Sequence, residues 1–260
     1  MRIRATVAAV SAALALSAFA VPAAHAAGST LDVTFSSMKV NSGKAITVGA
    51  TSTVKVKATY TLTHPSGVSV ANVLSGPVLY RGTSAKDADT QVVSDAPGTC
   101  TTVSSTTLHC SATITLPASD LYNADAGTWK QGGVAVDAKS GVQKWQNDLG
   151  TIPVRRAAKL TADATPEPVK KGGTITVTGK LTRANWETGK YAGYATQPVK
   201  LQFRKKGSST FTTVKTIKSS STGALKTTVT ASADGDFRYS FAGTSTTSAV
   251  SSAADFVDVQ

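Results

Sequence analysis

Side chains that perform acid–base chemistry are scarce in this 260-residue chain. It has three histidines, and only His64 and His109 lie beyond residue 26. Glutamate occurs only at Glu167 and Glu187. No G-x-S-x-G motif accompanies a serine, and a Ser-His-Asp triad would depend on one of these two histidines. No spacing predicts the facing carboxylates of a glycosidase. The composition disfavours a hydrolase and predicts a non-enzymatic protein without a cofactor.

Common metal motifs are also missing. The sequence has no H-E-x-x-H and no Cys and His cluster suited to zinc. The nearest calcium candidate is the set Asp120, Asn123 and Asp125. An EF-hand loop has different offsets and ends in a glutamate that this segment lacks. We therefore favour turn and capping hydrogen bonds as the role of these three side chains.

Long apolar runs are absent beyond the N-terminus. Arg2 and Arg4 precede an apolar segment. Ala24-His25-Ala26 then places small residues at positions −3 and −1 relative to a cleavage site after Ala26. This pattern predicts a secretory signal peptide over residues 1–26. The segment is short for a bilayer span, which needs about 20 residues. We expect a mature protein without a membrane span that is secreted, extracellular or non-covalently associated with the cell surface.

Positive charge is concentrated in the second half of the chain. Residues 27–154 contain nine Lys and Arg against eight Asp, a net charge of +1. Residues 155–260 contain sixteen against seven Asp and Glu, a net charge of +9. We expect these two ranges to be separate domains, each long enough to bury its own core. Outside the cell, the basic domain favours an anionic wall polymer or acidic polysaccharide, with a merely solvated surface as the alternative.

Alternation of apolar and polar residues predicts β-strands in both domains. The clearest segments are 54–63, 108–116, 175–181, 199–204, 225–230 and 237–241. Period two places one strand face on a core and the other in water. The number and spacing of strands predict an all-β fold with two consecutive immunoglobulin-like antiparallel β-sandwich domains. We expect one helical turn, over 117–127, and a short linker at 155–158.

The second domain carries a set of structural motifs. Residues 183–244 read RANWETGKYAGYATQPVKLQFRKKGSSTFTTVKTIKSSSTGALKTTVTASADGDFRYSFAGT. An aromatic loop leads into a V-x-L-x-F-R strand, a G-x-x-x-F-x-x-V hairpin follows, and D-G-x-F-R precedes the last strand. This arrangement resembles the Ig-like domains of secreted bacterial proteins, over residues 157–260. The resemblance implies a non-catalytic spacer, adhesion module or polymer-binding module.

An aromatic segment lies between two predicted strands of this domain. Its candidate ligand-binding residues are Trp186, Tyr191, Tyr194, Lys190 and Arg183. Aromatic faces can stack on sugar rings, and the cations can pair with anionic groups. In the alternative interpretation, Trp186 closes the end of the core and the tyrosines brace the loop.

Basic residues on predicted polar strand faces form a second candidate. They are Lys200, Arg204, Lys205, Lys206, Lys215, Lys218, Lys226 and Arg238. If the sheets follow the immunoglobulin order, several of them share one face. A cationic face suits a charged polymer, with binding that weakens as salt rises. Specific nucleic-acid binding is disfavoured because no recognition motif accompanies the charge.

The two cysteines, Cys100 and Cys110, are expected to form a disulfide in an exported protein. We expect this disulfide to close a loop onto the following strand, with a stabilisation of about 2–3 kcal/mol. Cys110 falls on the apolar side of that strand, and His109 falls on the opposite side. The bracketed loop is a candidate contact for an extracellular protein.

The leading hypothesis is a secreted Ig-like binding or structural module that contacts an anionic envelope polymer through its basic domain. The alternative is a protein-binding factor such as an inhibitor of an extracellular protease.

Overall fold

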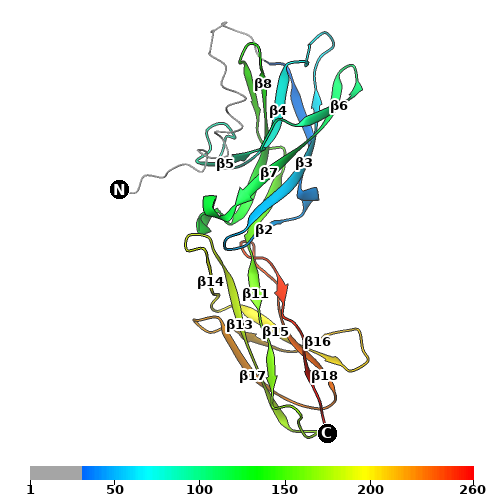
Figure 1. The fold of residues 1–260 in the computed structure, drawn as a ribbon, viewed down its shortest axis with the longest axis vertical. Coiled ribbons are helices and arrows are strands. Elements are labelled where there is room, and N and C mark those ends of the chain that lie inside the picture. Colours follow the sequence, from blue (N-terminus) through cyan, green and yellow to red (C-terminus); the bar gives the residue numbers. More distant parts are fainter. Residues whose placement is uncertain (1–30) are drawn as a thin grey trace, which may run out of the picture. The chain divides into compact units, whose positions relative to one another are not determined.

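The computed structural model describes residues 31–260, which are almost entirely β-structure (Figure 1). The predicted signal peptide lies outside the described residues. The described chain divides into two compact units: the first contains residues 31–46 and Ser52–Val154, and the second contains Thr47–Thr51 and Arg155–Gln260. Between residues 31 and 260, no helix has the length and hydrophobicity needed to cross a bilayer. The predicted all-β fold class is confirmed.

The first unit has two antiparallel sheets, in which the last two residues of β2 (47–48) and of β10 (155–156) already belong to the second unit. One has the order β1-β3-β7-β6. Its strands are β1 (Thr34–Val40), β3 (Thr53–Thr63), β7 (Thr107–Pro117) and β6 (Thr99–Ser104). The other has the order β2-β10-β8-β4-β5, and β9 also pairs with β8. Its strands are β2 (Ile46–Val48), β10 (Thr151–Arg156), β8 (Gly127–Asp137), β4 (Val73–Arg81), β5 (Thr90–Val93) and β9 (Gln143–Gln146). This is the strand order of an immunoglobulin sandwich.

Large side chains fill the first unit. Phe35, Ile114 and Trp129 are fully buried and come from both sheets. A satellite cluster that includes Tyr80 and Val134 packs against Trp145 of β9. Because β4 and β8 are covered by this cluster as well as by the core, both have long continuous buried runs instead of strict alternation.

The second unit also pairs two sheets. In the first, β13 (Thr174–Asn185) is flanked by β11 (Ala158–Leu160), β12 (Asp163–Thr165), β14 (Lys190–Gly193) and β17 (Ala224–Thr230). The second sheet has the order β16-β15-β18-β19, and β20 also pairs with β18. Its strands are β16 (Thr212–Lys218), β15 (Pro198–Lys205), β18 (Gly235–Phe241), β19 (Val250–Ser251) and β20 (Asp255–Val257). This again is the immunoglobulin order.

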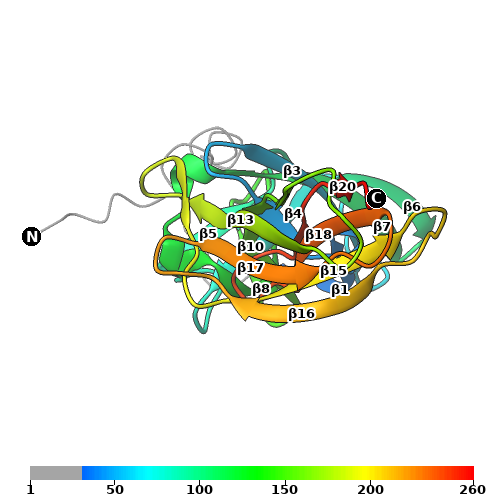
Figure 2. The same ribbon diagram turned by 90° about the horizontal axis from the view of Figure 1, so that it is seen from below.

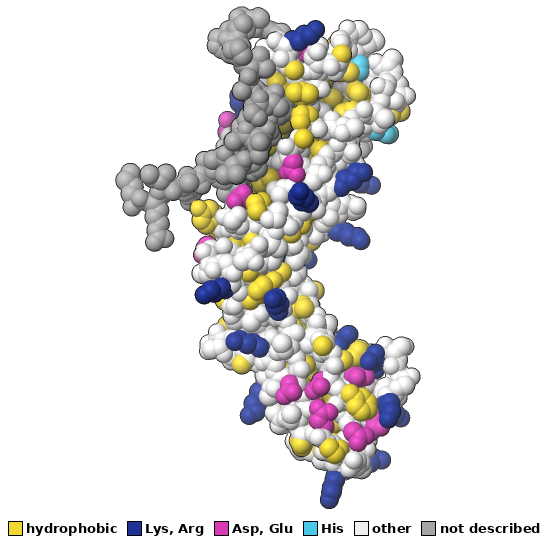
Figure 3. All heavy atoms as spheres, viewed as in Figure 1, with side chains coloured by type: hydrophobic (Ala, Val, Ile, Leu, Met, Phe, Trp, Pro, Cys, Tyr) yellow, Lys and Arg dark blue, Asp and Glu magenta, His cyan; other side chains and the backbone are white. Residues whose placement is uncertain are grey.

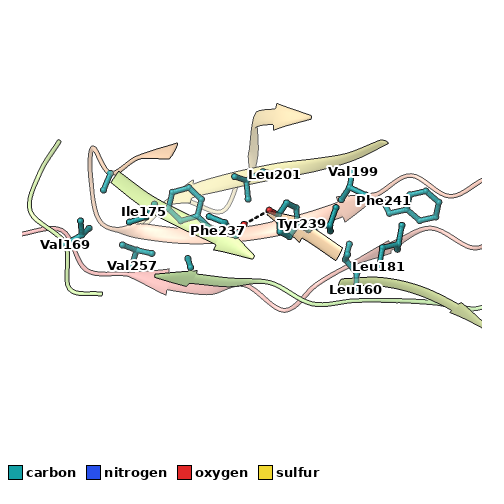
Figure 4. Packing of buried hydrophobic residues seen from close by; sticks show 14 residues of the cluster. Leu160, Val169, Ile175, Leu181, Val199, Leu201, Phe237, Tyr239, Phe241 and Val257 are labelled. Carbon is teal, nitrogen blue, oxygen red and sulfur yellow. Dashed lines mark hydrogen bonds between the residues drawn. The ribbon is translucent and has the colours of Figure 1, made fainter. Parts of the chain in front are cut away.

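Side chains from both sheets meet in the core of the second unit (Figure 4). Ile175 and Leu181 come from β13, and Leu201, Phe237 and Tyr239 come from β15 and β18. They occupy alternate positions of their strands, as the period-two pattern predicts.

Three segments differ from the sequence expectations. The predicted helical turn consists of two single 3₁₀ turns, η2 (Ala118–Asp120) and η3 (Asn123–Asp125). The predicted loop between the cysteines is a β-hairpin formed by β6 and β7. The predicted linker at 155–158 is strand apart from Ala157, because Arg155 and Arg156 end β10 and Ala158 begins β11, which pairs with β13.

Candidate functional site

The outer face of the β15–β18 pair carries two arginines. On β15, Val199 and Leu201 are buried, so Lys200, Gln202 and Arg204 point away from the core. The antiparallel register places Gln202 opposite Arg238 and Arg204 opposite Asp236. Directly opposed residues share a sheet face. The pairing of β15 with β18 therefore brings these four side chains together on the outside of the sheet.

Phe211 stacks against both arginines. The Arg238 guanidinium carbon lies 3.8 Å from the Phe211 ring centroid, and that of Arg204 lies 4.7 Å away. Each guanidinium is also oriented by a hydrogen-bond partner. Arg204 Nε and Nη2 donate to Asp236 Oδ2 at 3.1 and 2.9 Å, and Arg238 Nε donates to Gln202 Oε1 at 2.9 Å. We call these five residues the arginine–phenylalanine cluster.

The geometry of this cluster suits anion recognition. A guanidinium has five N–H donors in a planar fork that matches carboxylate and phosphate. The bond to Gln202 uses one donor of Arg238, and ring stacking reduces the motion of its side chain. Fixing a side chain before binding lowers the entropy cost of association. Asp236 offsets the charge of Arg204, so the cluster has a net charge of +1 and is a partly preorganised cationic surface centred on Arg238.

Exposed Lys200 and Lys218 extend this surface, whereas Lys205 and Lys215 lie opposite Gly235 and core-facing Leu201 and so fall on the other strand face. Lys200 pairs with Thr216 of β16, and Lys218 lies two positions further along the same strand. Lys200, Lys205, Lys206, Lys215 and Lys218 are all exposed. Lys206 Nζ lies 3.1 Å from Asp234 Oδ2 and 5.6 Å from the Phe256 ring centroid. The view in Figure 2 shows β16 at the margin of the second unit, beside β15.

Lys226 does not belong to this surface. It lies on β17, which pairs with β13 in the other sheet. The basic set predicted from the sequence is therefore divided: seven of its eight members belong to the β16-β15-β18 sheet and its adjoining turn, and one does not.

The predicted aromatic loop is a β-hairpin in which β13 pairs with β14. Trp186 is 4% exposed and its Nε1 donates to Gly49 O at 3.1 Å. Tyr194 makes an edge contact with buried Phe241 at 5.7 Å, and the Arg183 guanidinium covers its ring at 4.0 Å. These contacts hold Trp186 and Tyr194 within the packing of the second unit.

The remaining two residues of the predicted aromatic site are closer to solvent. Tyr191 is partly buried, and Lys159 Nζ lies 4.1 Å from its ring centroid. Lys190 is exposed. The three aromatic rings therefore occupy three different environments and do not form one continuous stacking platform.

Asp120 and Asp125, which the sequence offered as candidate calcium ligands, make local contacts. The Asp125 carboxylate accepts a hydrogen bond from Tyr122 N at 2.7 Å and lies 3.6 Å from Arg81 Nη1. Asp120 accepts from the Ser119 hydroxyl at 3.0 Å. In the part of the chain that the structure describes, no group of three or more His, Cys, Asp or Glu is placed to hold a metal ion. Asp125 thus makes the kind of turn contact favoured from the sequence.

The predicted disulfide between Cys100 and Cys110 is confirmed, with an S–S distance of 2.02 Å. The two cysteines lie directly opposite one another in the β6–β7 hairpin. Cys110 is buried, whereas His109 is exposed.

Acidic side chains gather elsewhere on the second unit (Figure 3). Burial first, and then the negative charges of Asp255 and Asp163, raise the pKa of Glu167. Asp255 also accepts a hydrogen bond from Ala164 N at 2.6 Å. Asp163 lies on β12, Glu167 follows β12, and Asp255 lies on β20, which pairs with β18.

Sequence reasoning missed Phe211, Gln202 and Asp236 as members of the cluster. The period-two pattern contained part of the signal, because it places Gln202 and Arg204 on one face. The pairing of β15 with β18 supplied the rest.

The sequence matches no family model and no curated protein. Solved structures that align with it include a marsupial T cell receptor, with a TM-score of 0.36, 10% identity, and coverage of 87% of this chain and 73% of that chain. The fibronectin(III)-like modules of Clostridium thermocellum CbhA align with a TM-score of 0.29, 12% identity, and coverage of 85% and 92%. The Yersinia pseudotuberculosis adhesin InvE aligns with a TM-score of 0.27, 14% identity, and coverage of 87% and 59%. At these scores the alignments carry no argument about function, and the immunoglobulin-like assignment rests on strand order.

Proposed function

We propose that this protein is a secreted, non-enzymatic immunoglobulin-like binding module. Its second unit binds an anionic cell-envelope polymer or polysaccharide through the outer face of β15, β16 and β18. The observation that carries this proposal is the arginine–phenylalanine cluster, in which Phe211 and hydrogen-bond partners orient Arg204 and Arg238. The net charge of +9 over residues 155–260 adds a long-range attraction for polyanions.

A binding assay with two defined polyanions tests the proposal. Long-chain polyphosphate and polygalacturonate are immobilised, and retention of the mature protein is measured as salt rises from about 0.1 M to about 1 M. The Debye length falls from about 10 Å to about 3 Å over this range, so binding by exposed charges should weaken strongly. Retention that is independent of salt would contradict an electrostatic mode of binding.

Paired lysine variants separate a specific face from net charge. Lys200→Gln with Lys218→Gln removes two charges from the proposed face. Lys180→Gln with Lys226→Gln removes two charges from exposed positions of the other sheet. We expect the first pair to lose roughly tenfold in affinity, which corresponds to about 1.4 kcal/mol, and the second pair to lose much less. Equal losses would mean that only total charge matters.

Arg238→Lys tests the role of guanidinium geometry. The variant keeps the charge but loses the planar fork and much of the stacking on Phe211. We expect weaker binding than wild type at every salt concentration, with an unchanged salt dependence. Wild-type affinity would show that the cluster contributes charge alone.

A protein partner is the second proposal. The disulfide-linked β6–β7 hairpin carries Val103, whose side chain is 57% exposed. A rigid exposed hairpin is suited to protein recognition, because little conformational entropy is lost on binding. Incubation with a panel of extracellular proteases would detect inhibition. Absence of inhibition across the panel would remove the protease-inhibitor version of this proposal.

A further inference from the structure

The outer face of the β1-β3-β7-β6 sheet in the first unit is built from hydroxyl groups and cations. Its outward positions on β3 are Lys55, Lys57, Thr59, Thr61 and Thr63. The residues opposite them on β7 are Thr115, Thr113, Ser111, His109 and Thr107. These ten positions include no acidic or aliphatic side chain, and the imidazole of His109 is the one ring among them. Strand propensity explains the many threonines at these exposed positions. It does not explain why the same face also has a groove.

The groove has a volume of about 610 Å³. Six serine and threonine side chains from all four strands line it, together with Lys39 and His109, and Tyr60 and Cys110 complete the lining. The volume falls within the usual range for small-ligand sites, about 300–1,000 Å³. No carboxylate and no side-chain amide is part of the lining.

A β-bulge in β1 places two of the lining residues. The register with β3 shifts between Ser36 and Lys39, so that two residues of β1 face one residue of β3. Met38 stays in the core at 8% exposure, while Ser37 is exposed at a φ of 52°. Positive φ is uncommon for serine, and bulges often re-aim side chains beside functional sites. The bulge adds the Ser37 hydroxyl to the face that already carries Lys39.

The hydrogen-bonding groups that line the groove indicate the charge of the ligand that it would bind. Ammonium groups only donate hydrogen bonds, whereas hydroxyls both donate and accept. A groove without carboxylates has no strong acceptor for a cation, and Lys39 gives it a positive charge. We propose that this groove binds an acidic sugar unit, with the carboxylate or phosphate near Lys39 and His109 and the ring hydroxyls on the serine and threonine side chains. The site belongs to the first unit, so it does not depend on the proposed function of the second.

His109 lies on the β7 side of the groove. Thr61 of β3 and Thr101 of β6 lie opposite it, and Lys39 also belongs to the groove lining. A protonated ring nitrogen of His109 can donate a hydrogen bond to a carboxylate or phosphate oxygen bound beside Lys39.

A titration followed by amide NMR of the complete mature protein tests this site separately from the second unit. The probes are trigalacturonic acid, glucose 6-phosphate and the neutral sugar maltotriose. We expect saturable shifts at Thr61, Thr101 and His109 with an acidic probe and not with maltotriose. The stronger of the two acidic probes identifies carboxylate or phosphate as the preferred group. Shifts confined to the second unit, or equal binding of maltotriose, would overturn the proposal.

Charge-neutralising variants complete the test. Lys39→Gln should weaken binding at every pH by about three- to fivefold, the effect of one exposed ion pair. Lys57→Gln is the matched control, because Lys57 lies on the same sheet face outside the groove lining. Unchanged binding in Lys39→Gln, or an equal loss in Lys57→Gln, would contradict the site.

Discussion

The Tyr239 hydroxyl donates a 2.8 Å hydrogen bond to the backbone carbonyl of Val177, and this bond joins the two sheets of the second unit (Figure 4). Tyr239 lies on β18 and Val177 on β13, and both residues are fully buried. A polar bond within an apolar core sets the register of one sheet against the other, because an unpaired carbonyl there would be costly.

Tyr239→Phe should lower the free energy of unfolding of the second unit by about 1–3 kcal/mol. The substitution keeps the ring but leaves the Val177 carbonyl without its hydroxyl partner. Chemical denaturation followed by the fluorescence of Trp186 measures the change, since Trp186 is buried in the same unit. An unchanged midpoint would mean that water or backbone movement replaces the bond.

Stability should also fall at high pH through the same residue. Burial raises the pKa of Tyr239 from 10.0 to about 12. The unfolded state therefore loses this proton at a lower pH than the folded state. The contribution is fully present below pH 10 and is lost as the pH rises toward about 12, with a total of about 2–3 kcal/mol. The difference between wild type and Tyr239→Phe across this range isolates the effect from that of other tyrosines. A difference that stays constant with pH would contradict it.

Removal of the disulfide should destabilise the first unit alone. The variant Cys100→Ser with Cys110→Ala removes a cross-link over a sequence separation of ten residues. Loop-closure entropy predicts a loss of about 2–3 kcal/mol. Differential scanning calorimetry should show a lower melting temperature for the first unit and an unchanged transition for the second. Wild-type protein treated with a reducing agent provides the control, and a shift of both transitions would indicate that the units do not unfold independently.

Gly133→Ala should destabilise the first unit by about 1–3 kcal/mol because of overpacking. A Cβ at this position would lie 2.6 Å from atoms of the Phe35 ring, which packs directly over the glycine. The double variant with Phe35→Leu provides the control, because a smaller side chain should relieve part of the clash. Thermal unfolding of the single and double variants measures the coupling. Additive losses would show that the ring is not the source of the strain.

Much of the fold could be predicted from local pattern. Segments such as 199–204 and 237–241 show period two because one side of each faces a core, and the structure places β15 and β18 there. Several other strands were not predicted. β6 has no buried residue and therefore no alternation of apolar residues, and β14 is a four-residue strand without one. Exposed edge strands form through backbone pairing with a neighbour, which leaves little trace in side-chain type.

The candidate sites, like the strands, could be predicted only in part from the sequence. Alternation alone places Lys200 and Arg204 on an outer face, and two cysteines in an exported chain predict a disulfide. Whether Lys226 shares that face, and whether Phe211 stacks on Arg204 and Arg238, depends on which strands pair. The sequence by itself determined strand periodicity, charge distribution and the cysteine pair, because these depend on neighbouring residues or composition. Only the tertiary structure decided sheet membership, the bulge at Ser37 and the clusters that result, because strand pairing joins residues far apart in the chain.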